Sequence, residues 1–238
     1  HVAFIFPPLI FYFLIKLSKN FSYWHTLGGL LSLAGLILAH NAITLMFLPL
    51  IFICIFYLIF QCSNKKYFIF NTLYLILLGL GLSAFFWIPA FMEGKYTLRD
   101  IVTGGGEYAR SFVMWKDFFI SEWSYGGTIA LSKQIGFIHW IGIFGSIISI
   151  HVLYRNKNKL WILTLGGFLI FWITLFLMTS SSNPIWQTIT TLQKFQFPWR
   201  FLSVTVFLSA LLGGILLSLI ANKYKKAALL ILVAGLLI

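Results

Sequence analysis

Every acidic residue of the chain lies in one short stretch. The five carboxylates of this 238-residue sequence are Glu93, Asp100, Glu107, Asp117 and Glu122. An ionised carboxylate at the centre of a bilayer costs about 3 kcal/mol or more. If the apolar remainder of the chain crosses a membrane, this stretch must lie outside the hydrocarbon. Chemistry that needs a carboxylate is therefore expected there, or in a part of the protein outside this sequence.

Three short sequences place further polar groups where a lipid headgroup would lie. One is the pair His40-Asn41 between two apolar runs. Another is an aromatic run, broken by a proline, that ends at Glu93. The third is an aromatic stretch that sets Trp199 and Arg200 before a late apolar run. A guanidinium can hold a phosphate through two hydrogen bonds, and a carboxylate or an imidazole can transfer protons.

Each of these groups also has a purely structural explanation. An arginine at a helix end can extend its guanidinium to lipid headgroups, a glutamate can be hydrated at the surface, and a histidine can cap a turn. The three sequences share the same predicted depth on one side of the membrane, so a joint role for Arg200, Glu93 and His40 stands as an equal alternative to the structural explanation.

The composition excludes an ordinary soluble domain. Apolar residues make up 60% of the chain and charged residues 9%. The net charge of +12 does not indicate nucleic-acid binding, because the basic residues stand in short clusters between apolar runs, as they do beside membrane helices. We expect contact with membrane lipids and none with nucleic acid. The oligomeric state is left open.

The apolar runs predict an all-α, polytopic transmembrane bundle in a single domain over residues 1–238. Lipid-facing backbone must satisfy its own hydrogen bonds, and the runs lack the alternation of barrel strands, so helices are expected. Seven full spans and the start of an eighth are predicted at residues 2–17, 22–39, 42–61, 68–91, 135–154, 159–179, 200–221 and 227–238. The last run is too short to cross, and the chain starts at His1 within an apolar run. We therefore expect a fragment that lacks its N-terminal part.

Basic clusters predict the orientation of these spans. They follow every second span, at Lys16 and Lys19, Lys65 and Lys66, Arg155 with Lys157 and Lys159, and Lys223 with Lys225 and Lys226. The positive-inside rule makes their side cytoplasmic. The protein is thus expected in the cytoplasmic membrane, with the loops 92–134 and 180–199 outside.

Each outer loop is predicted to contain an amphipathic helix on the membrane surface. In the first loop, aromatic residues recur at helical spacing, at Phe112, Trp115, Phe119 and Trp123. In the second loop, Asn183 is a candidate N-cap and Pro184 a first helical residue, with Pro198 as the stop. An apolar face would consist of Ile185, Ile189 and Leu192. The two helices could cover a cavity between spans, or simply shield the ends of the bundle.

Small residues recur along two predicted spans, and no motif indicates a cofactor. Gly28, Ser32 and Gly35 share one face, as do Gly142, Ser146 and Ser149, and we interpret both stripes as helix-packing surfaces. The five histidines show no spacing suited to a metal, so no metal ligands are assigned. The outer carboxylates could hold a divalent cation, and the cofactor is otherwise unknown.

At the three rim sequences the chain resembles a known family. His40-Asn41 at the outer end of a span, Trp87-Ile88-Pro89-Ala90 with Glu93, and Phe197-Pro198-Trp199-Arg200-Phe201 look like bacterial polytopic proteins labelled 6-pyruvoyl-tetrahydropterin-synthase-related. These in turn resemble YfhO-type members of the GT-C glycosyltransferase class. The resemblance covers about residues 25–221. It implies transfer of a sugar from a polyprenyl-phosphate carrier to a cell-envelope acceptor on the outer face.

The same resemblance implies that the catalytic carboxylates lie in an early outer loop outside this sequence, so the catalytic base stays unassigned. Weak candidates are Glu93 and His40, which would orient donor or acceptor groups. The substrate-binding candidates are Arg200, foremost for the phosphate, and Trp199, Asn41, Lys194, Glu122 and Asp117. Two alternatives stay open: a lipid or polysaccharide flippase or transporter, and a non-catalytic scaffold. An ion-coupled carrier is disfavoured because no carboxylate lies within a span.

Overall fold

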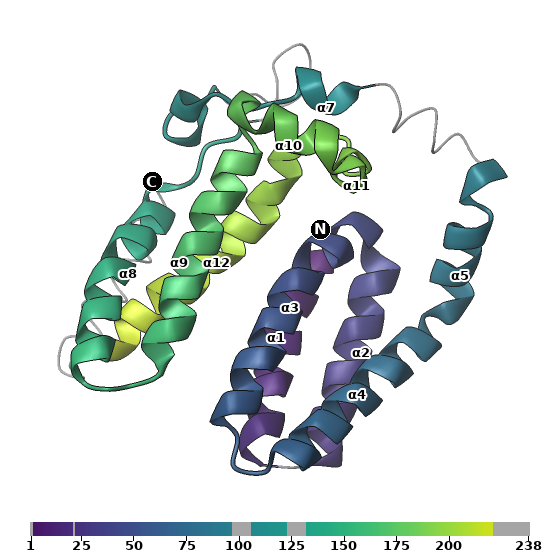
Figure 1. The fold of residues 1–238 in the computed structure, drawn as a ribbon, viewed down its shortest axis with the longest axis vertical. Helices are drawn as coiled ribbons and strands as arrows, with labels where there is room; N and C mark the ends of the chain where they lie inside the picture. The colour runs from purple at the N-terminus through teal and green to yellow at the C-terminus, as the bar shows by residue number, and fades with distance from the viewer. Residues whose placement is uncertain (1, 21, 97–105, 123–131, 221–238) are drawn as a thin grey trace. The chain divides into compact units, whose positions relative to one another are not determined.

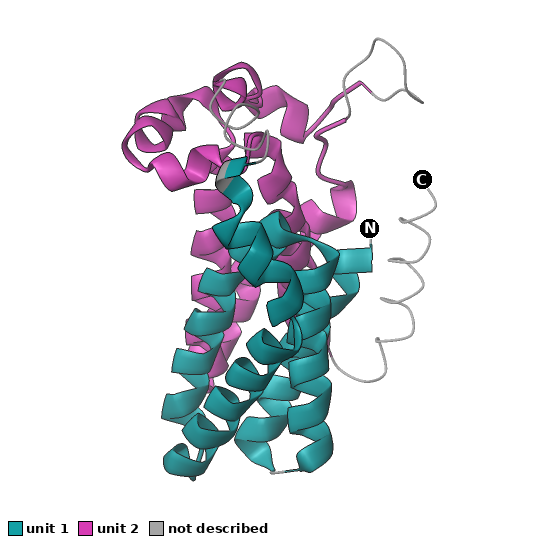
Figure 2. Cartoon of the chain, turned by 90° about the vertical axis from the view of Figure 1, so that its right-hand side faces the viewer, with its two compact units in different colours: residues 1–102 teal, residues 103–238 magenta. Residues whose placement is uncertain are grey.

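The computed structural model describes residues 2–20, 22–96, 106–122 and 132–220 (Figure 1). Within these ranges all the regular elements are helices, which confirms the predicted all-α class. The chain divides into two compact units, His1–Val102 and Thr103–Ile238, which Figure 2 colours separately. That the whole chain forms one transmembrane domain stays a prediction.

The first unit is built from a group of packed helices. In chain order they are η1 (Val2–Ile5), α1 (Phe6–Lys19), α2 (Tyr23–Ala39), α3 (Asn41–Gln61), α4 (Lys65–Leu82), α5 (Ala84–Met92) and η2 (Gly94–Tyr96). The small residues of α2 form its packing surface, as predicted. A Cβ at Gly28 would overlap the Phe13 ring of α1, and one at Gly35 would overlap the Phe6 ring. Ser32 between them is buried and donates its hydroxyl to the Gly28 carbonyl at 2.6 Å.

The predicted span 68–91 consists of two helices. The break falls at Ser83, which caps α4 and donates its hydroxyl to the Gly79 carbonyl at 2.9 Å. Pro89, where the sequence suggested the break, lies inside α5. A proline there removes one hydrogen bond of the helix, but the rest of α5 retains its helical backbone.

The second unit contains three long helices and several short ones. In chain order they are α7 (Glu107–Arg110), η3 (Trp115–Phe118), α8 (Phe137–Arg155), α9 (Leu160–Leu177), η4 (Ser180–Ser182), α10 (Asn183–Thr188), α11 (Thr190–Gln193), η5 (Pro198–Phe201) and α12 (Leu202–Leu219). Figure 1 shows α8, α9 and α12 side by side, with α10 and α11 at the end where α12 begins. The turn between α8 and α9 lies at the other end of this unit.

The close crossing of α8 and α12 depends on small residues. A Cβ added at Gly142 would lie 2.8 Å from the Ser209 carbonyl oxygen and 3.3 Å from the Gly213 Cα. Ser146 and Ser149 on the same face of α8 are fully buried. The second predicted small-residue stripe is therefore also a packing surface, of the kind that lets membrane helices approach closely.

Six helical segments are long and apolar enough to cross a membrane. They are Val2–Lys19, Asn41–Gln61, Lys65–Leu82, Phe137–Arg155, Leu160–Leu177 and Pro198–Leu219. Much of their apolar surface faces outward: Phe52, Phe56 and Phe60 follow one face of α3 and are 57–65% exposed. This chain is thus a multi-pass membrane protein in contact with lipid. The apolar helix α2 has 17 residues, so its span stays a prediction, and the predicted eighth span, 227–238, lies outside the described residues.

The predicted surface helix over residues 111–123 is wrong for its described part. Residues 111–122 contain only the short 3-10 helix η3 and are otherwise irregular, while Trp123 lies outside the described residues. The Val113 N–H donates to the carbonyl of Met178 at the end of α9, at 2.8 Å. The Ile135 N–H donates to the Phe118 carbonyl, also at 2.8 Å. These tertiary hydrogen bonds tie the segment to the rest of the unit, and they override the helical spacing of its aromatic residues.

The second outer segment is helical, but it differs from the prediction in detail. Asn183 is the first residue of α10 rather than its cap, and the helix is interrupted at Ile189 before α11 begins. The buried side chain is Trp186, while Ile185 and Ile189 are exposed. The short helices bury one aromatic ring against the unit, and the predicted continuous apolar face does not form.

Candidate functional site

The carbonyl end of α9 is capped by the short helices that follow it, η4 and α10. The Leu177 carbonyl accepts hydrogen bonds from Trp186 Nε1 at 2.9 Å and from the Ser182 hydroxyl at 3.0 Å. The last carbonyls of a helix lack partners within it, and in an apolar setting they need donors from elsewhere. Trp186 is fully buried as a result, and its ring stacks on Tyr108 with centroids 5.4 Å apart.

Trp186 also supports the turn that precedes α12. Its ring meets Phe201 edge to face at 6.3 Å, and Phe201 meets Phe195 in the same way at 5.5 Å. These rings connect the start of α12 to the loop that caps α9. Sequence reasoning missed Trp186, although a large aromatic ring in a polar segment after a proline was the signal that could have found it.

The turn itself contains a left-handed residue that is not glycine. Gln196 has φ 63°, and the Phe197 N–H donates across it to the Phe195 carbonyl at 2.7 Å. A three-residue turn with a positive central φ is rare and strained. Arg200 braces it, because its Nη1 donates to the same Phe195 carbonyl at 3.0 Å.

Arg200 is held by aromatic as well as polar contacts. Its guanidinium lies over the Phe197 ring, 5.0 Å from the centroid, and Phe197 stacks on Trp199 at 5.5 Å. The side chain is half-buried, and it forms no ion pair with a carboxylate among the described residues. One N–H braces the turn, which leaves further donors of the planar guanidinium for a ligand. The arrangement therefore suits bidentate binding of a phosphate at the end of a membrane helix.

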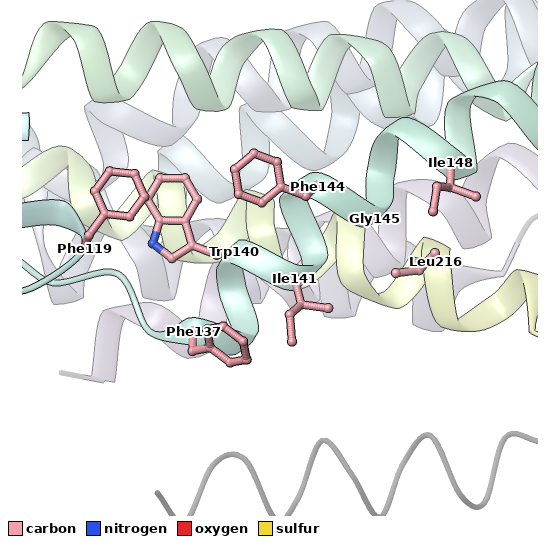
Figure 3. A pocket seen from close by; sticks show the side chains of 8 residues that line it. All are labelled: Phe119, Phe137, Trp140, Ile141, Phe144, Gly145, Ile148 and Leu216. Carbon is pink, nitrogen blue, oxygen red and sulfur yellow. The ribbon is translucent and has the colours of Figure 1, made fainter.

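An apolar groove runs along α8 in the same unit (Figure 3). It has a volume of about 600 Å³ and is lined by Phe119, Phe137, Trp140, Ile141, Phe144, Gly145, Ile148 and Leu216. Figure 3 shows the rings of Phe119 and Trp140 face to face at one end, with Ile148 and Leu216 at the other. The groove begins at the first turn of α8, which lies at the end of the unit where α12 begins (Figure 1), and Arg200 belongs to η5 directly before α12. An apolar groove open along a membrane helix suits a lipid chain.

A polar contact that the sequence did not indicate joins α8 to α12. His139 Nδ1 lies 2.7 Å from the Ser209 hydroxyl oxygen, which in turn lies 2.9 Å from the Val206 carbonyl. A hydroxyl has one proton, so if that proton goes to Val206, the imidazole N–H donates to Ser209. Ser209 is buried beside the Gly142 crossing, so the contact joins the helices rather than facing a substrate.

In the first unit, His40 and Asn41 form the junction between α2 and α3. His40 ends one helix and caps the next, with its Nδ1 accepting the Ile43 N–H at 3.4 Å. The Thr44 hydroxyl lies 3.0 Å from both the Leu36 and the His40 carbonyl oxygens. The capping explanation is therefore confirmed for His40, and Asn41 is exposed beside it.

Glu93 stands at the end of α5, where its own N–H donates to the Pro89 carbonyl at 2.8 Å. Its carboxylate is exposed and has no polar partner among the described residues. In Figure 1 the far end of α5 lies apart from the α2–α3 junction of the same unit. The structure does not show Glu93 and His40 brought together.

The remaining candidates lie apart along the two segments of the second unit that were predicted as outer loops. Asp117 is half-buried in η3, Glu122 is exposed, and Lys194 is exposed at the end of α11. Across the described ranges, no three His, Cys, Asp or Glu residues lie close enough to hold a metal ion. Of all the sequence candidates, only Arg200 and Trp199 are brought into one cluster, through the Phe197 ring.

No family model, curated protein sequence or solved structure matches this chain. The resemblance to the GT-C class therefore stays a prediction that rests on the three rim sequences.

Proposed function

We propose that this membrane protein binds a polyprenyl-phosphate-linked sugar and, as part of a GT-C-like glycosyltransferase, transfers the sugar to an envelope acceptor on the outer face of the membrane. The observation that carries the proposal is the braced guanidinium of Arg200. It belongs to η5, directly before the membrane helix α12, and the apolar groove along α8 begins at the end of the unit where α12 begins. A polyprenyl carrier offers one phosphate and one long apolar chain, which match these two features.

In the proposed reaction the phosphate is the leaving group. The acceptor hydroxyl oxygen bonds to the anomeric carbon of the sugar, and the bond from that carbon to the phosphate oxygen breaks. The hydroxyl proton goes to a base, and polyprenyl phosphate leaves with the electron pair. Arg200 would stabilise the charge that gathers on the phosphate, because a fixed donor in a site of low dielectric acts most strongly where charge develops.

The other candidates have lesser proposed roles. The end of α8 would receive the first isoprene units, with Phe119 and Trp140 as their contact surface. Trp199 and Lys194 would contact the sugar or the phosphate, and Asp117 would lie over the site. Asn41, Glu93, His40 and Glu122 stay weaker candidates. The base and any divalent cation stay unassigned.

Lipid translocation is the second candidate function. It is favoured by the open groove on α8 and by the scattered positions of the carboxylates in the described part of the chain. A flippase needs a path for a lipid chain and a site for its headgroup, but no base.

Transfer and translocation are separated by one reconstitution. The purified full-length protein in vesicles would receive a polyprenyl-phosphate sugar labelled in the sugar, together with an envelope extract as acceptor. The proposal predicts label in a product that no longer partitions with the carrier. Label that crosses the bilayer while still attached to the carrier would support translocation instead. If the protein neither transfers nor translocates the label, the scaffold alternative is supported.

A further inference from the structure

A second cluster of cations and aromatic rings lies at the turn between α8 and α9. Tyr154, Arg155, Lys157 and Trp161 line a pocket of about 510 Å³. The Tyr154 and Trp161 rings meet edge to face with centroids 5.5 Å apart. The pocket stands at the junction of two membrane helices, where aromatic rings and cations meet lipid headgroups.

The backbone of this turn is fully ordered by its own hydrogen bonds. The Lys157 N–H donates to the Tyr154 carbonyl at 3.0 Å, and the Asn158 N–H donates to the Leu153 carbonyl at 2.9 Å. This pair of bonds is the Schellman ending of a helix. Asn158 stands one residue before Lys159, the N-cap of α9, and its side-chain oxygen accepts the Leu160 N–H at 3.0 Å. The first N–H groups of α9 are occupied, so any anion here must be bound by side chains.

Lys157 occupies the position in this turn that glycine normally takes. Its φ is 52°, in the left-handed region, where a Cβ is unfavourable. Glycine would form the same turn at lower cost. A lysine in this place is explained if its ammonium group serves a ligand, because strain of this kind gathers at binding sites.

The cations around the pocket have no acidic partner. Arg155, Lys157 and Lys159 form no ion pair in the part of the chain that the structure describes. All acidic residues of the sequence fall between residues 93 and 122, in a loop predicted for the opposite side of the membrane. An anion at this turn would therefore meet no carboxylate from its own neighbourhood.

We propose that the pocket at the α8–α9 turn binds the phosphate of an anionic phospholipid headgroup between Arg155 and Lys157, with Tyr154 and Trp161 contacting the glycerol region. The group that the pocket would bind is a phosphate ester, which is found both in a phospholipid headgroup and in a soluble phosphate compound. The lipid is the better match because both helices that form the pocket are membrane spans and their rings lie at its edge. Such a site would anchor the predicted cytoplasmic end of the second unit.

The test uses the purified full-length protein in a neutral detergent. Short-chain phosphatidylglycerol, phosphatidylcholine with the same chains, and inorganic phosphate are titrated separately, and the thermal unfolding midpoint gives an apparent affinity for each. The variants are Lys157→Gly, Lys157→Arg and Arg155→Gln. Lys66→Gln is the matched control, since it removes an exposed cation on the same predicted face but in the first unit.

Phosphatidylglycerol is expected to bind more tightly than the other two probes. Its affinity should fall about fivefold for each pocket cation removed. The affinity for phosphatidylglycerol should be unchanged in Lys157→Arg and in the Lys66→Gln control. The Lys157→Gly protein should unfold at the same or a higher temperature without lipid, so lost binding would not mean lost folding.

Each other outcome counts against the proposal. Equal binding of phosphatidylcholine would show that the anionic headgroup is not recognised, and equal binding of inorganic phosphate would identify a soluble ligand. If Lys66→Gln lost as much affinity for phosphatidylglycerol, the effect would be due to net charge rather than to this pocket. Unchanged affinity in Lys157→Gly would show that the Lys157 ammonium group does not bind the headgroup.

Discussion

The turn before α12 and the turn between α8 and α9, at opposite ends of the second unit, each contain a non-glycine residue with a left-handed backbone conformation. In the described ranges, Gln196 with φ 63° and Lys157 with φ 52° are the non-glycine residues that have positive φ. Each stands close to an arginine and to aromatic rings. The surroundings differ: Arg200 is half-buried and hydrogen-bonded to its own turn, whereas Arg155 and Lys157 are exposed and unpaired within the described part.

This difference separates a fixed site from an adaptable one. A guanidinium held by a carbonyl and a ring loses little freedom when a ligand arrives, so it can favour one phosphate geometry. Exposed, solvated cations on long side chains attract many anionic headgroups and distinguish poorly among them. We therefore expect substrate recognition at Arg200 and lipid anchoring at Lys157.

The largest expected effect concerns the sides of the membrane on which η3 and the α8–α9 turn lie. Single cysteines would replace Asp117 and Lys157 in a protein without Cys54 and Cys62. In intact cells an impermeant thiol reagent should label the cysteine at position 117 and leave the one at position 157 unlabelled, because the positive-inside rule places the Lys157 turn in the cytoplasm. Permeabilised cells are the control, and there both should react. Equal labelling in intact cells would reverse or abolish the assigned sides.

The next effect concerns the helix crossing that supports both turns. Gly142→Ala should destabilise the protein by about 1–3 kcal/mol, because the new methyl group meets the Ser209 carbonyl and the Gly213 backbone. Gly166→Ala is the matched control, since a Cβ there meets nothing within 4 Å, and it should be neutral or slightly stabilising. Unfolding of the purified proteins in detergent measures both changes. Equal stability of the two variants would mean that the α8–α12 contact is looser than described.

Glycine substitutions compare the two strained positions directly. Gln196→Gly and Lys157→Gly should each stabilise the protein by roughly 1 kcal/mol by relieving left-handed strain. Only Lys157→Gly removes a cation, so only it should weaken binding of anionic lipid. Thermal unfolding with and without phosphatidylglycerol measures both quantities. A loss of stability in Lys157→Gly would contradict the left-handed assignment of that residue.

The smallest effect concerns the polar contact between α8 and α12. Interhelical hydrogen bonds in membrane proteins contribute about 0.6 kcal/mol on average. A double-mutant cycle with His139→Phe and Ser209→Ala should give a coupling free energy of that order. The same cycle with His151→Phe, an exposed residue of α8, should give no coupling to Ser209. Zero coupling for His139 would show that the 2.7 Å contact contributes nothing to stability.

The sequence predicted the membrane helices because hydrocarbon allows few alternatives for an apolar run. The small-residue stripes at Gly28 and Gly142 could also be predicted as packing surfaces, since close helix packing requires small residues. The prediction of a surface helix over residues 111–123 was wrong because the spacing of aromatic rings carries no information on hydrogen-bond partners outside the segment. Val113 is hydrogen-bonded to Met178, and Phe118 to Ile135.

The candidate site was only partly predictable for the same reason. Arg200 could be identified from its type and its place before an apolar run. The features that hold it, the Phe195 carbonyl and the Phe197 ring, follow from local and tertiary contacts that leave no periodic signal in the sequence. His40 kept the capping role that the sequence offered as its structural explanation.

The central claim is that Arg200 binds the phosphate of a polyprenyl carrier, and the affinity of the full-length protein for polyprenyl phosphate tests it most directly. Arg200→Lys keeps the charge but loses the planar pair of donors. Lys116→Gln is the control, because it removes an exposed cation of η3 that has no role in the proposed site. We predict that Arg200→Ala weakens binding about 100-fold, on the scale of about 3 kcal/mol for a charged hydrogen bond, that Arg200→Lys recovers part of this loss, and that Lys116→Gln changes little. Unchanged affinity in a folded Arg200→Ala protein would contradict the account and leave Arg200 as a brace for the Gln196 turn.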